Sequence, residues 1–581
     1  MEASDFLPPA GEPYLGFPSG NFKAFEQIAQ LLSKHTRRQA AVDHAPETAW
    51  KGALVLLGSI LLNSGIDGGW ELVAAVEAII SAILEDITAA PDREEALAQA
   101  RGEFDPQNRE TPLKVHRTTV EDLLPALTEA ELNGVVEDQY VEEMTIRDAS
   151  GAKSPKVTVV IDATAESVVA EHPNGTFTAV KVGGKAKWED GFQYPCLYDV
   201  THQMFLGAYH RGKNAASGSA GPALPPDVQA LQGASATVAR AGSKVALFEA
   251  DRGYFKGDLF AAATFGFLSP EASPSEQPRL VVPKKFGPDK AKVTWEYLTC
   301  SDQPAVFVDH IKAFPRANSP LWEACGASFE RTKDGGYEVP YACVALAGDG
   351  CQENDSALAE VRAEARVVQE GIEKSEQDLQ AVETEYVAHR KQATGKEGHK
   401  PGYGRGARRK KFDDPEDERL YHECFRRREE QKKWTGKKIP LMLAVFFIAV
   451  SLRPGEDPTG HANMFVRLAR DYCQRWGIEN GFRDLKHAFL RKIRGAQPTR
   501  RLLNLVLGML LYNRWHGERC RELLAACREV AWNKKPYDSR RPWNRRKLEQ
   551  KIGGAVSARS FLIRVWASGI KFLIQKRFKG I

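Results

Sequence analysis

Residues 472–486 read YCQRWGIENGFRDLK, and this stretch predicts a helix with two different sides. Its polar side would carry side chains that recur at three- and four-residue steps: Tyr472, Arg475, Glu479, Arg483 and Lys486. Its apolar side, for docking on a core, would consist of Ile478, Phe482 and Leu485. The cations outnumber the one carboxylate, so this face suits a metal ion together with a polyanion. The alternative is a solvated helix whose charges pair with one another.

The spacing of four of these residues resembles a family signature. The order Tyr, two residues, Arg, three residues, Glu, six residues, Lys is that of the insertion-sequence-four family of DDE transposases. In this chain the order falls at Tyr472, Arg475, Glu479 and Lys486. At ordinary residue usage, a chain of this length would contain that spacing by chance with odds on the order of one in a few hundred. The sequence LLYNRW at 510–515 is also similar to the carboxy-terminal helices of that family.

The resemblance implies two further acids upstream, each at the end of a buried strand. The first candidate is Asp162, which closes the β-branched run PKVTVVID at 155–162. The second is Asp251, which closes SKVALFEAD at 243–251 and precedes Arg-Gly-Tyr, as in the family. The interval between them leaves room for strands at 177–184, 194–202 and 204–211. The alternative for either aspartate is a turn or helix-cap residue.

By the same resemblance, the chain would be an enzyme of cut-and-paste DNA transposition. Asp162, Asp251 and Glu479 would hold two Mg²⁺ ions, for which Mn²⁺ could substitute, because Mg²⁺ prefers carboxylate oxygens. The phosphates beside the scissile bond would be bound by Tyr472, Arg475, Lys486 and Arg483. The partners would be double-stranded DNA, both transposon ends and target, and a second copy of the chain in a synaptic homodimer. A non-catalytic DNA-binding regulator and a Mg²⁺-dependent nuclease without strand transfer are the alternatives.

The expected fold is α/β, with an RNase H-like core of a mixed sheet flanked by helices. An insertion rich in strands would interrupt this core and delay Glu479, and a helical domain would precede it. The expected divisions are an N-terminal helical domain at 1–150, the first part of the core at 151–286, the insertion at 287–450, the second part of the core at 451–527 and a basic C-terminal region at 528–581. Within the first part, a helix at 255–268 and a strand at 279–285 would follow Asp251.

The insertion combines two kinds of sequence. Strands are expected at 292–300, 305–312, 337–348 and 441–450. Between the last two, residues 355–434 predict an antiparallel helical hairpin, because apolar residues from Val361 to Tyr386 follow heptad steps. The basic loop at 396–411 would form its tip and contact DNA, or the hairpin would be a spacer or oligomerisation arm.

One aromatic residue of the insertion is a candidate for stacking on a base. Related transposases use such a residue to hold a flipped base while the flanking strand forms a hairpin. Trp295, in the expected strand at 292–300, is the candidate here, and Trp322 is the second choice. Stacking would contribute roughly 1–3 kcal/mol, whereas the alternative is an ordinary core tryptophan.

Composition and charge indicate a large multidomain protein. The net charge of the 581 residues is only +4, but residues 528–581 contain fifteen Lys or Arg against three Asp or Glu. Residues 390–411 contain nine against one, so two basic segments could contact phosphates. Nine cysteines without a CxxC pair argue for buried thiols in a reducing compartment. The N-terminus lacks the features of a signal peptide, so we expect a cytoplasmic protein associated with the nucleoid when bound to DNA.

Overall fold

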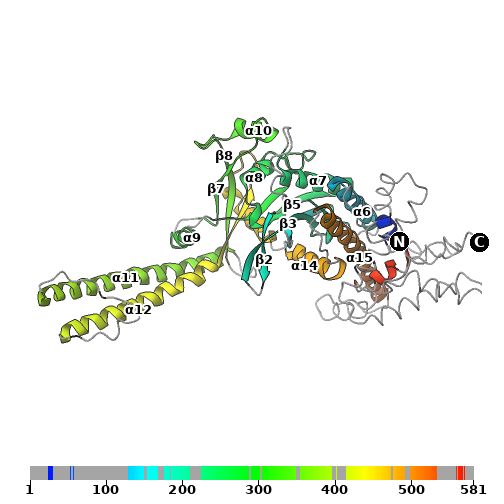
Figure 1. Cartoon of the computed structure of the whole chain (residues 1–581). Helices are drawn as coiled ribbons and strands as arrows, with labels where there is room; N and C mark the ends of the chain where they lie inside the picture. The colour runs from blue at the N-terminus through cyan, green and yellow to red at the C-terminus, as the bar shows by residue number, and fades with distance from the viewer. Residues whose placement is uncertain are drawn as a thin grey trace, which may run out of the picture. The chain divides into compact units, whose positions relative to one another are not determined.

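A computed structural model describes the chain from short N-terminal pieces to residue 569 (Figure 1). The described residues are 24–29, 53, 57, 60, 128–149, 153–167, 176–182, 185–209, 224–286, 290–300, 304–347, 354–394, 401, 412, 414–472, 476–490, 498–532, 558, 561–566 and 568–569. The helical domain expected at 1–150, the basic loop at 396–411 and the basic region at 528–581 fall mostly outside these residues.

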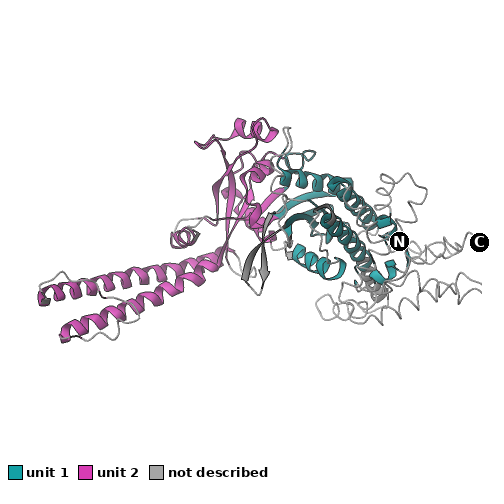
Figure 2. Ribbon diagram, in the orientation of Figure 1, with its two compact units in different colours: residues 1–249, 267–278, 474–581 teal, residues 250–266, 279–473 magenta. Residues whose placement is uncertain are grey.

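The fold is mixed α/β, with nine described strands in one sheet. The chain divides into two compact units, coloured separately in Figure 2. Unit 1 comprises residues 1–249, 267–278 and 474–581, and unit 2 comprises residues 250–266 and 279–473. The chain therefore leaves unit 1 after the strand that ends near residue 250 and returns to it shortly before Glu479.

Unit 1 contains the first five strands. They are β1 (Lys156–Ser167), β2 (Thr176–Val182), β3 (Lys185–Asp199), β4 (Met204–Ala208) and β5 (Lys244–Ala250). Their hydrogen-bonded order is β2-β3-β1-β5, and β4 also pairs with β3. The β1–β3, β2–β3 and β3–β4 pairs are antiparallel. Because the Lys244 N–H donates to the Pro155 carbonyl (2.9 Å), β1 and β5 start side by side and run parallel.

Helices of unit 1 pack on this sheet. They are α6 (Glu129–Ala149), α7 (Pro226–Arg240), α14 (Trp476–Asp484), the π-helical turn η8 (Leu485–Phe489) and α15 (Pro498–Trp532). Helix α6 begins with a capping box, in which Thr128 and Glu131 satisfy each other's backbone N–H groups. Helix α7 is the crossover that a parallel β4-to-β5 connection needs. The core joins apolar residues of α14, η8 and α15 to those of β3 and β4.

Two consecutive polar residues of α15 fasten it to the rest of unit 1. Asn513 is fully buried; its amide accepts a hydrogen bond from Phe205 N (2.8 Å) and donates one to Phe205 O (2.9 Å). This pairing satisfies the backbone of β4 on the side away from β3. Arg514, only 1% exposed, donates to Glu143 (2.6 Å) and Glu142 (2.5 Å) of α6. The similarity of LLYNRW to a transposase helix therefore falls on residues that hold three elements together.

Unit 2 contains the other four strands. They are β6 (Arg279–Pro283), β7 (Val306–Ala313), β8 (Tyr337–Ala347) and β9 (Val445–Ser451). Their order is β6-β9-β8-β7, and all three of these pairs are antiparallel. The shorter helices of this unit are α8 (Gly257–Thr264), α9 (Lys290–Thr299), α10 (Pro320–Ser328) and α13 (Ala462–Asp471).

A long helical hairpin extends from unit 2, formed by α11 (Asn354–Thr394) and α12 (Pro415–Leu443) (Figure 1). Later residues of α11 contact earlier residues of α12, as expected for two antiparallel helices. Near the base of the hairpin Gly371 meets Trp434, further out Asp378 pairs with Arg427, and near the far end His389 pairs with Asp417. The heptad pattern therefore predicted an antiparallel hairpin correctly.

Most expected strands are confirmed, and three expectations are wrong. Strands were expected and found near 177–184, 194–202, 204–211, 243–251, 279–285, 305–312, 337–348 and 441–450. The segment 292–300 is not a strand but helix α9. Strand β1 does not end at Asp162 but continues to Ser167. The stretch 472–486 is not one helix, since α13 ends at Asp471 and α14 begins at Trp476. Among the described helices, none has the length and apolar character needed to cross a membrane.

Replacing Arg514 should destabilise unit 1 strongly. In Arg514→Ala the carboxylates of Glu142 and Glu143 lose their cation while Glu143 stays fully buried, so the free energy of unfolding should fall by about 3–5 kcal/mol. The matched control is Arg240→Ala, which removes an exposed pair between α7 and Asp138 of α6 and should cost about 1 kcal/mol or less. Urea unfolding followed by tryptophan fluorescence measures both, and equal losses would contradict this account.

Candidate functional site

Asp162 lies inside strand β1. It is opposite Cys196 of β3, and its carboxylate is half-buried. Its Oδ1 accepts a hydrogen bond from the Ala163 N–H (2.8 Å). The strand continues beyond Asp162 because residues 163–167 pair with residues 191–195 of β3. Asp162 is therefore a strand residue, and the turn alternative does not apply to it.

Asp251 directly follows strand β5. Its backbone is extended (φ −68°, ψ 161°), and a short 3₁₀ helix, η4 (Arg252–Tyr254), begins after it. Its carbonyl accepts a hydrogen bond from Tyr254 N (2.8 Å), but its side chain makes no capping hydrogen bond. The helix-cap alternative for Asp251 is thus not realised, and its half-buried carboxylate is not used by the turn.

Glu479 lies on α14, and two glycines bring this helix close to strand β3. A Cβ atom on Gly477 would lie 2.6 Å from Val200 Cγ1, and one on Gly481 would lie 3.0 Å from the Tyr198 ring. The first separation is shorter than carbon atoms tolerate and the second is unusually tight, so a larger residue at either position would require the neighbouring side chain, β3 or α14 to move. The expected apolar side is confirmed, since Ile478, Phe482 and Leu485 are buried in the core of unit 1.

The same packing gives the direction of Glu479. On a helix with 3.6 residues per turn, residues two positions before and two after a given residue lie on the opposite side. Gly477 and Gly481 face β3, so Glu479 faces away from β3. Helix α14 also contacts β1, the strand that carries Asp162. The structure thus brings the elements of Asp162 and Glu479 together, and the Glu479 side chain is half-buried.

The predicted phosphate-binding residues have different surroundings. Arg483 and Lys486 are exposed, on α14 and η8 respectively. The guanidinium of Arg483 lies 3.7 Å from the neighbouring Asp484, and Lys486 lies over the Phe482 ring. Tyr472 follows the last residue of α13 and belongs to unit 2, whereas Glu479 belongs to unit 1. Arg475 lies outside the described residues.

Trp295 has the surroundings of a packing residue. It is on helix α9 and only 6% exposed. Its indole Nε1–H donates to Gln369 Oε1 of α11 (2.6 Å), and Lys438 of α12 lies over its ring. A ring in this position has no open face for a base, so we do not assign it a stacking role. Trp322, the second choice, is half-buried on α10.

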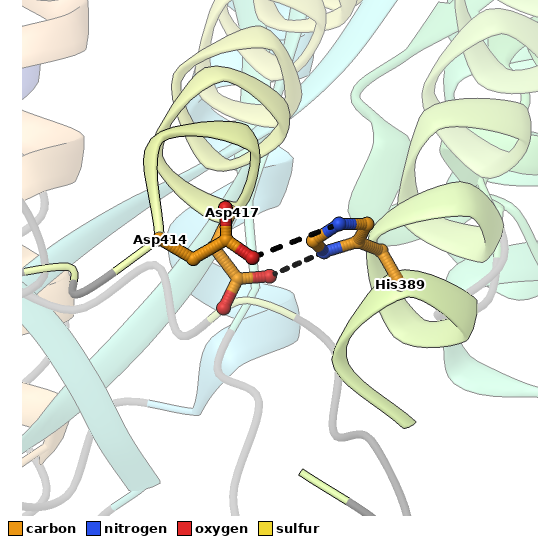
Figure 3. A group of neighbouring side chains, drawn as sticks. All are labelled: His389, Asp414 and Asp417. Carbon is orange, nitrogen blue, oxygen red and sulfur yellow. Dashed lines mark hydrogen bonds and ion pairs between the residues drawn. The ribbon is translucent and has the colours of Figure 1, made fainter. Parts of the chain in front are cut away.

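The structure also assembles a group that the sequence did not indicate. Near the far end of the hairpin, His389 of α11 lies between Asp414 and Asp417 at the start of α12 (Figure 3). Its Nδ1 is 3.0 Å from Asp417 Oδ1, and its Nε2 is 3.7 Å from Asp414 Oδ2. Among the described residues, this is the one group of three His, Cys, Asp or Glu side chains with ligand atoms within 4.8 Å of one another. Asp162, Asp251 and Glu479 do not form such a group, and Asp251 belongs to unit 2.

The chemistry of the His389 group is that of an ion pair that fastens two helices. The hydrogen bond with Asp417, followed by the charges of Asp414, Asp417 and Glu416, raises the pKa of His389. Asp414 also caps α12 by accepting from Glu416 N (2.8 Å), and Arg390 lies 3.7 Å from Asp417. One histidine and two carboxylates could hold a metal ion, but these side chains already contact one another, and the Arg390 guanidinium supplies positive charge beside Asp417. The heptad seam could have signalled the group, since it aligns residue 389 with the start of α12.

Comparison with known proteins adds no family to this description. No protein-family model matches the chain, and no curated protein matches its sequence.

Filling the contact between α14 and β3 should loosen α14. In Gly477→Ala the new methyl group would meet Val200, so we expect a free-energy loss of about 1–3 kcal/mol and faster amide exchange in α14. The double variant with Val200→Ala, which removes the clashing methyl, should recover most of this loss. The control is Gly134→Ala in α6, where a Cβ meets nothing within 4 Å and where alanine should stabilise by about 0.5–1 kcal/mol. No recovery in the double variant would show that the contact does not set the position of α14.

The far end of the hairpin should loosen as pH rises. Because the folded pKa of His389 is raised, its contribution to stability is complete below the ordinary histidine pKa of about 6.5. That contribution is lost as pH rises through the folded pKa. Hydrogen exchange of residues 385–394, corrected for intrinsic pH dependence, should therefore speed up across this range. In His389→Gln this extra pH dependence should disappear, whereas in the control His422→Gln, whose imidazole is 61% exposed, it should remain.

Proposed function

We propose that this protein is a DDE transposase that cleaves and joins DNA by metal-dependent phosphoryl transfer. The carrying observation is that Asp162 lies on β1, that Asp251 directly follows the neighbouring parallel strand β5, and that the helix of Glu479 packs against β1.

The strand order of unit 1 supports an RNase H-like core. Strands β1, β3 and β4 form an antiparallel meander in which β3 is central, and β5 lies on the other side of β1. β5 runs parallel to β1 and is reached through the crossover helix α7. An RNase H-like sheet has this arrangement of its first four strands. Here β2 is an addition that extends the β1–β3 ribbon.

The register of β1 and β5 supports a shared position for the two aspartates. The strands are joined at their starts, where Lys244 N donates to Pro155 O. Counted from this bond, Asp162 lies seven residues along one strand and Asp251 seven residues along the other. In a parallel pair this bond places Lys244 opposite Lys156, so Asp162 lies opposite Ala250 and Asp251 follows one residue further along. We therefore expect both carboxylates at the same edge of the sheet.

The direction of Glu479 supports a third carboxylate at this edge. Its helix contacts β1, and Glu479 lies on the side of α14 opposite to β3. The contact of α14 with β1 therefore brings the helix of Glu479 to the strand that carries Asp162. We expect Glu479 to approach Asp162 and Asp251 when substrate and ions are bound, because metal sites of this kind are completed by substrate phosphates.

The donor set fits Mg²⁺ in its chemistry. All three side chains offer carboxylate oxygens, and no imidazole or thiolate is among them. Asp251 makes no capping hydrogen bond that would compete for the ion. When bound, a pair of Mg²⁺ ions would stabilise negative charge on the attacking and leaving oxygens of a phosphoryl transfer. The protein's own part is to hold these carboxylates on two strands and one docked helix.

The cations near Glu479 would orient the DNA. Arg483 and Lys486 follow Glu479 by four and seven residues and are exposed, so both can reach phosphates. Tyr472 and Arg475 are assigned to phosphate binding on the family resemblance alone. Their role is to position the scissile phosphate, since in phosphoryl transfer positioning and charge stabilisation supply most of the catalysis.

The reaction outcome distinguishes transposition from the two alternatives. The purified full chain is incubated with Mg²⁺ and labelled duplexes taken from both sides of its gene. Cleavage followed by joining to a second duplex supports a transposase, and cleavage alone supports a nuclease. Binding without cleavage supports a non-catalytic DNA-binding regulator and overturns the proposal. Replacing Mg²⁺ by Mn²⁺ should preserve cleavage, and chelation should abolish it.

Glu479→Gln should abolish strand cleavage with little effect on DNA binding. The amide keeps the size of the side chain but removes the anionic ligand, so the rate should fall at least about 10³-fold. The control is Asp484→Asn, which makes the same chemical change elsewhere on α14 and should leave cleavage within about two-fold of the original. Retained cleavage in Glu479→Gln, or an equal loss in the control, would contradict the assigned role.

A further inference from the structure

The cations of helix α12 fall into two groups. Towards the far end of the hairpin, four of them are paired with carboxylates. Arg419 pairs with Glu416, Arg426 and Arg427 both pair with Glu423, and Lys432 pairs with Glu429. These pairs are intrahelical, so the outer part of α12 presents little net charge. The proximal part of the helix is different.

Three lysines near the base of the hairpin have no carboxylate partner among the described residues. They are Lys433, Lys437 and Lys438, which we call the lysine surface, and all belong to unit 2. Residues 431–444 contain four lysines and no acidic residue. Lys433 and Lys437 are exposed, whereas Lys438 is half-buried. The positive charge of this segment is therefore not compensated within the segment itself.

Two tryptophans support the lysine surface. Lys437 lies over the ring of Trp434 (4.2 Å to the centroid), and Lys438 lies over the ring of Trp295 (4.7 Å). Trp434 is packed against the backbone of Gly371, and Trp295 is buried and hydrogen-bonded to Gln369. A cation over a ring keeps its N–H donors available while its position is restricted. The ammonium groups of Lys437 and Lys438 are thus held in place without being neutralised.

We propose that the lysine surface binds the phosphate backbone of duplex DNA without regard to sequence. The choice of DNA as partner rests on the proposed function. Lys433 and Lys437 are four residues apart, so they rise by roughly 6 Å along the helix. Phosphates recur along each strand at roughly 3.4 Å per base pair of axial rise, so these two lysines can reach different phosphates. Lysine ammonium groups provide charge but no base-reading geometry, which suits backbone contacts.

This assignment changes the role expected of the hairpin. The sequence placed DNA contact at the basic loop 396–411, at the far end of the hairpin. The lysine surface is instead at the base, where α12 packs on α9. DNA bound there would also contact the region of the chain that links the hairpin to strand β9. The two tryptophans then have a structural role in DNA binding without touching a base.

The test uses the full chain with chelator present, so that cleavage plays no part in the result. Binding to a fluorescent duplex of arbitrary sequence is measured by anisotropy over a series of KCl concentrations. The variant is Lys433→Gln/Lys437→Gln/Lys438→Gln. The control is Arg419→Gln/Arg426→Gln/Lys432→Gln, which removes the same charge from cations that are paired on the same helix. Circular dichroism and the hairpin's amide exchange check that both variants fold.

In the lysine variant, the slope of log affinity against log salt should decrease by about 2–3, at roughly 0.9 per lost phosphate contact. Affinity at about 0.1 M salt should fall on the order of 10- to 100-fold, and the control should stay within about two-fold. An unchanged slope in the lysine variant, an equal effect in the control, or no DNA binding by the original chain would each overturn the proposal. If an acidic protein were the true partner, DNA affinity would be unchanged, which overturns it as well. Because no metal is present, failure here is separate from the cleavage test of Glu479.

Discussion

The close contact between α14 and strand β3 is the constraint on which the rest of unit 1 depends. The helix begins more than 270 residues after the end of that strand, with the whole of unit 2 between them in the sequence. Two glycines remove the side chains that would keep helix and strand apart, and the Tyr198 ring occupies the space. Tyr198 in turn hydrogen-bonds Tyr512 of α15 (3.0 Å). Distance along the sequence therefore does not determine which elements of unit 1 are neighbours, whereas this packing does.

Buried polar groups determine the position of α15 in unit 1. An apolar core alone would let α15 slide or rotate, because apolar contact is not directional. Asn513 fixes its height by pairing with both backbone groups of Phe205. Arg514 fixes its rotation by reaching two carboxylates of α6. Each of these groups would be costly to bury without its partner, so alternative positions of α15 are strongly disfavoured.

The sequence predicted the strands well because they are short apolar runs, such as β4 and β9, or alternating segments, such as β7. It failed at 292–300 because that segment fits two periods. Val293, Trp295 and Tyr297 alternate as in a strand, but Thr294, Trp295, Tyr297 and Leu298 also follow helical spacing, and these four are the buried ones. The packing of α9 on α11 decides between the two periods, and periodicity alone cannot. The group at His389 could be inferred only through the register of the hairpin, because its aspartates are more than twenty residues away in the sequence.

For the candidate site, the sequence named candidate acids but not the contacts that position them. Strand propensity placed Asp251 directly after its strand, and the family spacing selected Glu479. Two features could not be predicted from the sequence. They are the bond between Pro155 and Lys244, which sets the register of β1 and β5, and the partner of the glycines beside Glu479.

Counting charged residues in the sequence was also not enough to locate the cations that are available for DNA. The outer part of α12 is rich in cations, yet Arg419, Arg426, Arg427 and Lys432 are paired there with carboxylates. Lys433, Lys437 and Lys438 near the base have no carboxylate partner among the described residues. A count of charges gives the number of possible phosphate contacts, and only the pairing of those charges shows which cations remain to make them.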